Sequence, residues 1–268
     1  MNHRPTARRL FWIATSTLLA GSCLHAAESP PFQPFDATYT VQRGNAEIGR
    51  LKAVLEQRED GLWHYRIESE ATAWYVRLLG ISTTESAWFQ WTGEGVLPLT
   101  YHHVSREPGS DRFWQHRYDW RDMHTETRTH DGEFEIELAD GVVDPLTLRL
   151  EAAARLAEQA PEFESFELSV LERDEIEKQR YRHTGTETLE IDGRCFRTVV
   201  FKRFRKEGSS RNYTAWHAES LGWMPLRIRH EDDGKPITLT LDTWDSPATD
   251  LPARTGCGSD QAAGKAVE

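Results

Sequence analysis

The sequence predicts a mainly β protein: a single antiparallel curved sheet or incomplete β-barrel with one packed α-helix at about residues 144–159. Three observations support this prediction. Apolar and polar residues alternate over many short stretches, glycine-containing turns separate those stretches, and one long amphipathic pattern has the helical period. A strand that is apolar on one face must bury that face, so hairpins in series favour a curved sheet with the helix on its open side.

The N-terminus has the pattern of a secretory signal peptide over residues 1–26. Arg4, Arg8 and Arg9 precede a broken apolar run over residues 10–20, and Leu24-His25-Ala26 offers a cleavage site. The run is shorter than the about 20 residues that a membrane span needs, so we expect no transmembrane span in the mature chain. We therefore expect a periplasmic protein, secreted through a cleaved N-terminal signal peptide.

Three cysteines bear on the compartment. Ala20-Gly21-Ser22-Cys23 partly resembles the lipobox of bacterial lipoproteins, in which the cysteine is acylated, but that pattern has a larger aliphatic residue where Ala20 stands. We expect cleavage after Ala26 rather than lipoprotein anchoring at Cys23. Cys195 and Cys257 would remain in an oxidising compartment, where they either pair or stay free.

A β-rich domain is expected over residues 35–245, followed by a disordered tail over 246–268 that is rich in small and polar residues. Within the domain, alternating strands flank tight turns, and Asp-Gly supplies the positive φ that such turns need. In chain order the expected hairpins are 51–55 with 63–67, a turn at 130–132 leading into 134–138, 189–191 with 196–200, and 226–230 with 237–241.

Two segments break the strand pattern. Residues 73–79 form a short apolar segment with room for one or two helical turns. In the second, Asp144 is a good N-cap and Pro145 suits the first turn of a helix that ends at Ala160-Pro161. This helix has an apolar face made of Leu146, Leu150, Ala153, Ala154 and Ala157, with charged residues around it at Arg149, Glu151, Arg155 and Glu158.

The charge of the chain argues against nucleic acid as a partner. The formal net charge is −11 at pH 7, and cleavage of the signal peptide removes three arginines and no acidic residue. Phosphate backbones would repel such a chain, and so would anionic lipid headgroups.

No motif for catalysis or cofactor binding is found. The chain has no Gly-x-Ser-x-Gly nucleophile elbow and no Cys-x-x-Cys or His-x-x-x-His spacing for a metal. His102 and His103 are adjacent in an expected strand, so they point to opposite faces and do not readily bind one ion. We expect no catalytic residues, no metal and no cofactor, and hence a protein that is not an enzyme.

The tryptophans are the most suggestive residues, and nine of them follow the signal peptide. Trp88 and Phe89 must face opposite ways in a strand, so the aromatic residues cannot all belong to one surface. They either pack a large core or line a concave groove for an apolar or glycan ligand, with the 73–79 segment as a lid or as a cap on the core. If they line a groove, the expected ligand-binding residues are Trp74, Leu78, Trp88, Trp91, Trp114 and Trp216.

Four pieces of sequence carry a resemblance to a known family. They are Phe35–Val41 with Ile48-Gly49, Gly95–Tyr101, Asp144-Pro145-Leu146, and Trp216–Ile228 with its Leu-Gly-aromatic turn. In this order they resemble the exported bacterial proteins known as domain of unknown function 3108 (DUF3108). The resemblance implies a Gram-negative periplasmic β protein with no assigned reaction.

Two function hypotheses follow, from different classes. The first is a non-catalytic periplasmic protein that binds an apolar or amphiphilic, lipid-like component of the cell envelope. The alternative is an interaction scaffold that binds another envelope protein through a sheet edge or an aromatic patch. An enclosed cavity of about 300 Å³ or more favours the first hypothesis, and a flat aromatic patch favours the second. A buried cluster of acids or histidines with shifted pKa values would instead favour a third hypothesis, an enzyme.

Overall fold

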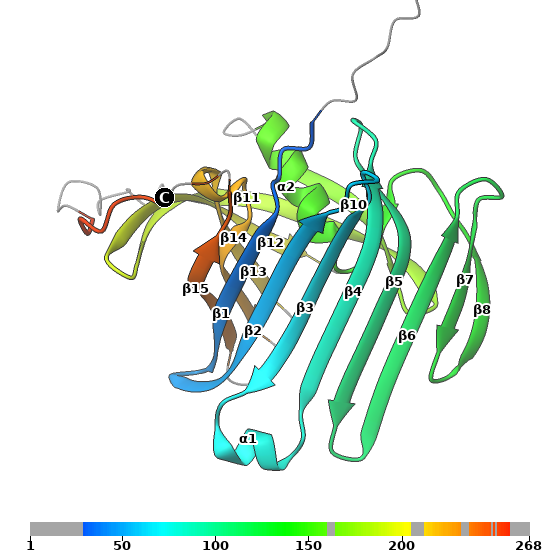
Figure 1. The fold of residues 1–268 in the computed structure, drawn as a ribbon, viewed down its shortest axis with the longest axis horizontal. Helices are drawn as coiled ribbons and strands as arrows, with labels where there is room; N and C mark the ends of the chain where they lie inside the picture. The colour runs from blue at the N-terminus through cyan, green and yellow to red at the C-terminus, as the bar shows by residue number, and fades with distance from the viewer. Residues whose placement is uncertain are drawn as a thin grey trace, which may run out of the picture.

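A computed structural model describes residues 29–159, 164–204, 212–231, 236–247, 249 and 251–257 (Figure 1). The predicted signal peptide and Cys23 lie outside these residues. Most of the described chain forms strands: β1 (Phe35–Arg43), β2 (Ala46–Gln57), β3 (Trp63–Ala71), β4 (Ser82–Trp91), β5 (Val96–Glu107), β6 (Ser110–Asp119), β7 (His124–Thr129), β8 (Gly132–Glu137), β9 (Val142–Val143), β10 (Ser165–Glu172), β11 (Glu175–Ile191), β12 (Arg194–Phe204), β13 (Asn212–Ala218), β14 (Pro225–Glu231) and β15 (Ile237–Asp245). The helices are α1 (Trp74–Leu78), α2 (Leu148–Gln159) and the 3₁₀ turn η1 (Glu219–Leu221).

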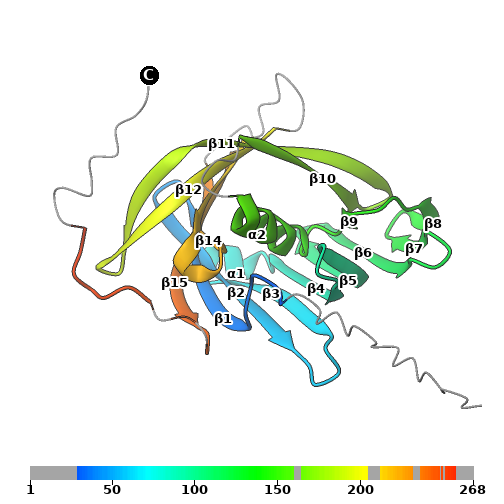
Figure 2. The same ribbon diagram turned by 90° about the horizontal axis from the view of Figure 1, so that it is seen from above.

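All these strands belong to one open sheet. Their order is β8-β7-β6-β5-β4-β3-β2-β1-β15-β14-β13-β12-β11-β10-β9, so each strand from β1 to β8 and from β10 to β15 lies beside its neighbour in the chain. The first and last strands, β1 and β15, pair and join the two meanders. The sheet curves around α2 without closing into a barrel, as the view from above shows (Figure 2). The predicted fold class is therefore confirmed.

The four predicted hairpins form, although the sequence named no partner for residues 134–138. Their strand pairs are β2 with β3, β7 with β8, β11 with β12, and β14 with β15. The turn at Asp192-Gly193 shows the local cause, because both residues have positive φ, 51° and 68°, and Ile191 pairs directly with Arg194. Positive φ at both turn residues matches the right-handed twist of the two strands.

The predicted N-cap of the long helix forms, but the regular helix begins later than expected, at Leu148. The carboxylate Oδ1 of Asp144 accepts hydrogen bonds from the backbone N–H groups of Leu146 and Thr147, both at 2.8 Å. The N–H of Leu148 then donates to the carbonyl of Asp144 at 2.9 Å. Asp144 thus caps the segment as predicted, and one tight turn precedes α2.

The helix α2 is buried on two sides rather than one. One side, with Leu146, Leu150 and Ala153, packs into an aromatic core that includes Phe32, Trp63 and Phe89, while Leu148, Ala152 and Leu156 pack against β10 to β12. Ala157, predicted on the apolar face, is exposed. Glu151, predicted on the polar side, is buried and accepts hydrogen bonds from the Val96 N–H at 2.9 Å and Arg155 Nε at 3.0 Å. The curved sheet therefore contacts α2 on two sides, and the buried surface of the helix is wider than the apolar face predicted from the sequence.

Cys195 and Cys257 form a disulfide, which the sequence left open. Around it, Gly256 N donates to the Gly193 carbonyl at 2.8 Å, and Arg254 pairs with Asp192. The described residues 251–257, which belong to the segment predicted to be disordered, therefore lie against the β11–β12 turn.

Candidate functional site

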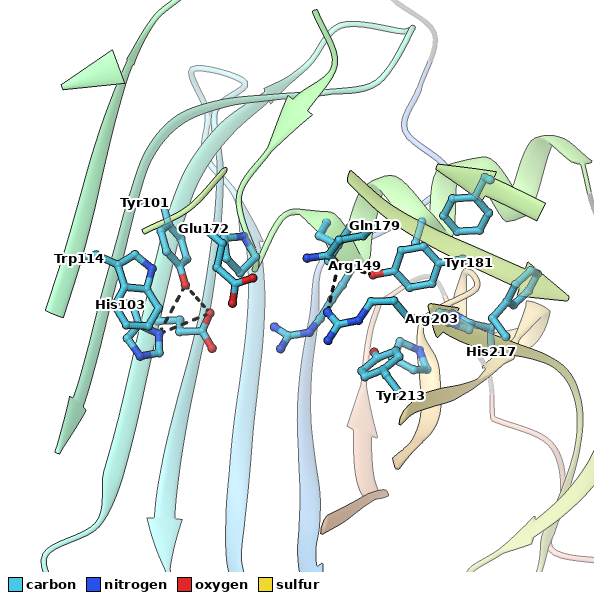
Figure 3. A pocket seen from close by; sticks show the side chains of 17 residues that line it. Tyr101, His103, Trp114, Arg149, Glu172, Gln179, Tyr181, Arg203, Tyr213 and His217 are labelled. Atoms are coloured by element: carbon cyan, nitrogen blue, oxygen red, sulfur yellow. Dashed lines mark hydrogen bonds and ion pairs between the residues drawn. The ribbon is translucent and has the colours of Figure 1, made fainter. Parts of the chain in front are cut away.

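The concave face of the sheet holds a cavity of about 250 Å³ beside α2. The strands β4 to β6 form one wall, β11 to β13 form the opposite wall, and α2 contributes Leu148, Arg149 and Ala152 (Figure 3). These walls bring together residues that are far apart in the sequence, because the open sheet curls over the helix.

The first wall carries a compact group of polar and aromatic side chains. The Tyr101 hydroxyl donates to Glu85 Oε2 at 2.7 Å, and His103 Nδ1 lies 4.0 Å from the same oxygen. The His103 ring stacks on Trp114, with ring centroids 3.6 Å apart. The geometry fixes Glu85 as a buried carboxylate facing the cavity.

The opposite wall is built around Gln179. Its Oε1 accepts hydrogen bonds from Arg203 Nη1 and from the Tyr181 hydroxyl, both at 3.0 Å. The guanidinium of Arg203 lies over the ring of Tyr213, 5.1 Å from its centroid, which adds a cation–π contact. These contacts hold Arg203 with its charged end at the cavity.

Arg149 of α2 is the central residue of the site. Its guanidinium extends into the cavity beside that of Arg203 (Figure 3), and Glu85 lines the same cavity. The Nη1 atom is inaccessible to solvent and has no hydrogen-bond partner among the described residues. A buried donor without a partner is costly. Since this atom is closed to solvent, Arg149 offers a ligand in the cavity the positive charge of its guanidinium.

A smaller apolar cavity of about 20 Å³ adjoins the main one. Arg149 and Pro225 line both cavities. Its other lining residues are mostly apolar: Tyr39, Leu51, Ala53, Tyr65, Ile67, Ile228 and Leu239. Arg149 and Pro225 thus lie between the main cavity and a small, mostly apolar space.

The turn between β10 and β11 reaches across the gap between the two meanders. Glu172 lines the cavity, and the guanidinium of Arg173 lies 5.6 Å from the centroid of Trp114 on β6. Arg173 has φ 60°, a strained value for a non-glycine residue, which turns the chain sharply at this contact. This turn closes one side of the cavity.

The shifted pKa values at the cavity describe groups held in their usual charge states. For Glu85, burial raises the pKa, but His103, Arg149 and Tyr101 outweigh burial and the net shift is downward. For Arg149, burial lowers the pKa, but Glu85 and nearby tyrosines outweigh it and the net shift is upward. Burial raises the pKa of Tyr101 and Tyr213, and it lowers that of His217 to about 4, partly offset by the Trp223 carbonyl. Each of these shifts moves the pKa away from neutrality.

The structure does not bring the six predicted ligand-binding residues together. Trp114 alone among them lines the cavity. Trp91 packs against the core, with its ring centroid 5.6 Å from that of Phe32. Trp74 and Leu78 are exposed on α1, at the end of the sheet away from α2 (Figure 1).

Trp88 and Trp216 are held by other contacts. Trp88 stacks on His64 at 4.1 Å between ring centroids, whereas Phe89 is fully buried in the core, so the predicted opposite orientation of Trp88 and Phe89 is confirmed. Trp216 donates from Nε1 to Glu187 Oε2 at 2.7 Å and lies under the Arg227 guanidinium. Neither residue lines the cavity.

Sequence reasoning missed Arg149, Arg203, Gln179 and the tyrosines of the cavity. A usable signal was the alternation of polar and aromatic residues on one strand face, as in Tyr101 with His103 and Gln179 with Tyr181. No comparable signal marks Arg149, because it sits beside other charged residues in the helical pattern.

In the part of the chain that the structure describes, neither helix is long and apolar enough to cross a bilayer. Within the same residues, no group of three or more His, Cys, Asp or Glu side chains could hold a metal ion. The residues that line the cavity offer hydrogen bonds, the guanidinium groups of Arg149 and Arg203, the carboxylates of Glu85 and Glu172, and aromatic surface.

Fold and cavity together define a β-barrel-like protein whose open sheet encloses a small polar-to-apolar site. The chain belongs to the family described as "Protein of unknown function (DUF3108)", which matches residues 35–242 and confirms the resemblance inferred from the sequence. A search of curated proteins found no match.

Two solved structures are similar to this chain. A β-barrel-like protein of domain of unknown function DUF1849 from Brucella abortus has a TM-score of 0.53 at 10% identity, covering 81% of this chain and 99% of that one. This likeness supports the β-barrel-like fold. The crystal structure of MucB has a TM-score of 0.33 at 12% identity, covering 87% of this chain and 60% of MucB, which is too low to indicate a shared fold.

Proposed function

We propose that this protein is an exported, non-catalytic protein of the periplasm that binds an amphiphilic cell-envelope molecule in the cavity. The observation that carries the proposal is the guanidinium of Arg149, which lines the cavity together with that of Arg203. An anionic group on a ligand would form charge-assisted contacts with these two guanidinium groups. The N-terminal pattern of residues 1–26 supports the location.

The distribution of side chains favours a ligand with two chemical ends. Arg149 and Arg203 would hold an acidic head, while Leu51, Ile228 and Leu239 of the adjoining cavity would contact an apolar part. The main cavity, at about 250 Å³, is slightly smaller than the roughly 300 Å³ at which small-molecule sites usually begin. We therefore propose that the cavity encloses the head and the first part of the chain of such a ligand, rather than a whole lipid.

The pKa shifts favour binding over catalysis. A general acid or base works best with a pKa near the working pH. The shifts at Glu85, Arg149 and Tyr101 stabilise a permanent carboxylate, a permanent guanidinium and a neutral phenol. Fixed charges of this kind orient a ligand, and we propose that they do so here without a chemical step.

Native mass spectrometry of the mature protein, purified gently from the periplasm, tests the proposal. We expect a co-purifying lipid-sized mass in the wild type and a loss of roughly tenfold or more in Arg149→Met, because one charge-assisted hydrogen bond contributes about 1.5–3 kcal/mol. Arg128→Met is the matched control, since Arg128 pairs with Glu133 in an exposed ion pair away from the cavity. Thermal unfolding of both variants checks that they fold.

Two results would contradict this function. The first is a wild-type protein without any bound mass. The second is a bound mass that Arg149→Met retains as fully as Arg128→Met. Either result would show that the cavity does not bind the proposed ligand. Trp88→Ala should keep the mass, because Trp88 stacks on His64 and does not line the cavity.

The alternative of an interaction scaffold receives less support from the sheet edges. The edge strand β8 exposes Glu133, Glu135 and Glu137, and the other edge, β9, has two residues. Charged side chains and short length both oppose the addition of a strand from another protein.

A further inference from the structure

The connection between β3 and β4 carries most of the large apolar side chains that are exposed in the described chain. We call residues Trp74–Ile81 the α1 tip; it lies at the end of the sheet away from α2 (Figure 1). Of the six large apolar side chains that are exposed among the described residues, five belong to it: Trp74 at 75%, Tyr75 at 43%, Leu78 at 80%, Leu79 at 51% and Ile81 at 37%. A cluster of this kind on one short segment marks an interaction surface.

Backbone hydrogen bonds give the α1 tip a defined shape. The N–H groups of Val76 and Arg77 both donate to the Ala73 carbonyl at 3.0 Å, and Gly80 N donates to the Arg77 carbonyl at 3.0 Å. Gly80 has φ 67°, which lets the chain leave the helix and enter β4. The helix buries none of its own residues, so the fold of the sheet does not require its apolar side chains.

The apolar surface of the α1 tip is wide rather than confined to one stripe. At helical spacing, Trp74 and Leu78 lie on one side of the helix, and Tyr75 and Leu79 lie on an adjacent side. A helix that binds in a protein groove presents a single apolar face, whereas an element that enters lipid meets apolar surroundings on several sides. Tryptophan and tyrosine are also the residues enriched at the boundary between headgroups and acyl chains.

The charge of the α1 tip differs from that of the whole chain. Residues 71–81 contain one charged residue, Arg77, and no acid, in a protein of formal net charge −11. The neighbouring residues add three arginines and four acids: Arg43, Arg106 and Arg112, and Glu47, Glu70, Glu107 and Asp111. Together with Arg77 these residues have no net charge. This end of the molecule can therefore approach a zwitterionic surface without the repulsion that the rest of the chain would meet at an anionic one.

We propose that the α1 tip docks this protein on a zwitterionic lipid bilayer by inserting Trp74, Leu78 and their apolar neighbours at the headgroup–acyl boundary. Arg77 remains at headgroup level, where its long side chain can keep the guanidinium in water. The contact is apolar, so it is insensitive to salt. It does not depend on what the central cavity binds.

Flotation with vesicles of pure phosphatidylcholine tests the docking, with the folded mature protein and no added ligand. We expect the wild type to float with the vesicles and the double variant Trp74→Ser with Leu78→Ser to bind roughly tenfold or more weakly, because each exposed apolar side chain gains favourable free energy when it leaves water. Both residues are exposed, so the substitutions should leave thermal unfolding unchanged. Phe113→Ser, which removes the sixth exposed apolar side chain on β6, is the matched control and should bind as the wild type does.

A second readout places the tip in the bilayer. Vesicles with brominated acyl chains should quench part of the wild-type tryptophan fluorescence, and Trp74→Phe should remove that part while keeping the binding. The proposal is overturned if the wild type does not float, if the double variant floats as well as the wild type, or if salt at roughly 0.5 M abolishes the binding. A wild type that ignores vesicles but binds another protein through the tip would assign the surface to a protein partner.

The outcome is separable from that of the proposed function. The Trp74→Ser with Leu78→Ser variant keeps Arg149 and the whole cavity, so it should retain any co-purifying mass. Arg149→Met keeps the α1 tip and should float with vesicles.

Discussion

Arg149 and Asp144 are two charged residues at the N-terminal end of the α2 region with different surroundings. Arg149 faces a cavity that a ligand can enter, whereas Asp144 is fully buried at the start of α2. Asp144 Oδ1 caps the helix, but Oδ2 has no hydrogen-bond partner among the described residues. Burial raises the pKa of Asp144 to about 6, and the hydrogen bonds from Thr147 and Leu146 offset burial only in part. A carboxylate that is ionised at neutral pH therefore weakens the fold at this position.

The substitution Asp144→Asn should stabilise the protein at neutral pH. The folded-state pKa of Asp144 is higher than its usual value of 3.8, so its favourable contribution is complete below about pH 4 and is lost as the pH rises through about 6. Asparagine keeps an oxygen for the two backbone N–H groups and carries no charge. We expect Asp144→Asn to be more stable than the wild type by roughly 1–3 kcal/mol at pH 7.5, with the difference shrinking towards pH 4. Urea unfolding of both proteins across this range measures it, and a difference that is constant with pH would contradict the assignment.

At the scale of elements, α2 shows where a sequence pattern stops being informative. The cap at Asp144 could be predicted because it depends on local chemistry. The burial of Arg149 and Glu151 could not, because a helical pattern does not reveal that a sheet covers the helix from two sides. Burial of Glu151 depends on the Val96 N–H, which is 55 positions away in the sequence.

The aromatic residues show the same limit on single strands. Alternation correctly predicted that Trp88 and Phe89 face opposite ways. It also correctly predicted opposite orientations for His102, which is exposed, and His103, which lines the cavity. It could not indicate which of the two faces is concave. Of the predicted site residues, Trp114 lines the cavity, while Trp88 and Trp216 lie away from it.

The disulfide ties the last described segment to the β11–β12 turn, and its removal should destabilise the protein. The bridge joins residues 62 positions apart. In the chain-entropy model, a cross-link over a loop of that length reduces the conformational entropy of the unfolded chain and so stabilises the folded state by about 4 kcal/mol. We expect the double variant Cys195→Ser with Cys257→Ser to lose roughly 2–4 kcal/mol of unfolding free energy. A reductant should produce a similar loss in the wild type and none in the variant. A loss below about 1 kcal/mol would show that the segment is held by its other contacts.

On the scale of the whole molecule, the hairpins and the curved sheet followed from the sequence, but the strand order did not. Each hairpin depends on a turn and two neighbouring strands, which the sequence displays side by side. The pairing of β1 with β15 brings Asp36 opposite Asp245 and Arg43 opposite Ile237. Nothing local specifies this pairing, and it determines where the two meanders meet and hence where the cavity lies.

Because β15 is hydrogen-bonded to both β1 and β14, it should be required by both meanders. We expect a chain that ends at Glu231 to lose cooperative thermal unfolding. Removal of β15 exposes the edges of β1 and β14 and takes Leu241 out of the core. A chain that ends at Asp245 is the control, because it keeps β15 and lacks only the disulfide-bonded segment. Cooperative unfolding of the shorter chain would show that the two meanders are stable separately.

The pairing of the first strand with the last also sets a time order on folding. Strand β1 has its second partner some two hundred positions later in the chain, so the sheet cannot be completed until synthesis, and any transport, of the whole chain is over. Long-range pairing of this kind slows folding, and during the delay the open edge of β1 is available to wrong partners. The strand that is synthesised last thus completes the pairing of the strand that is synthesised first.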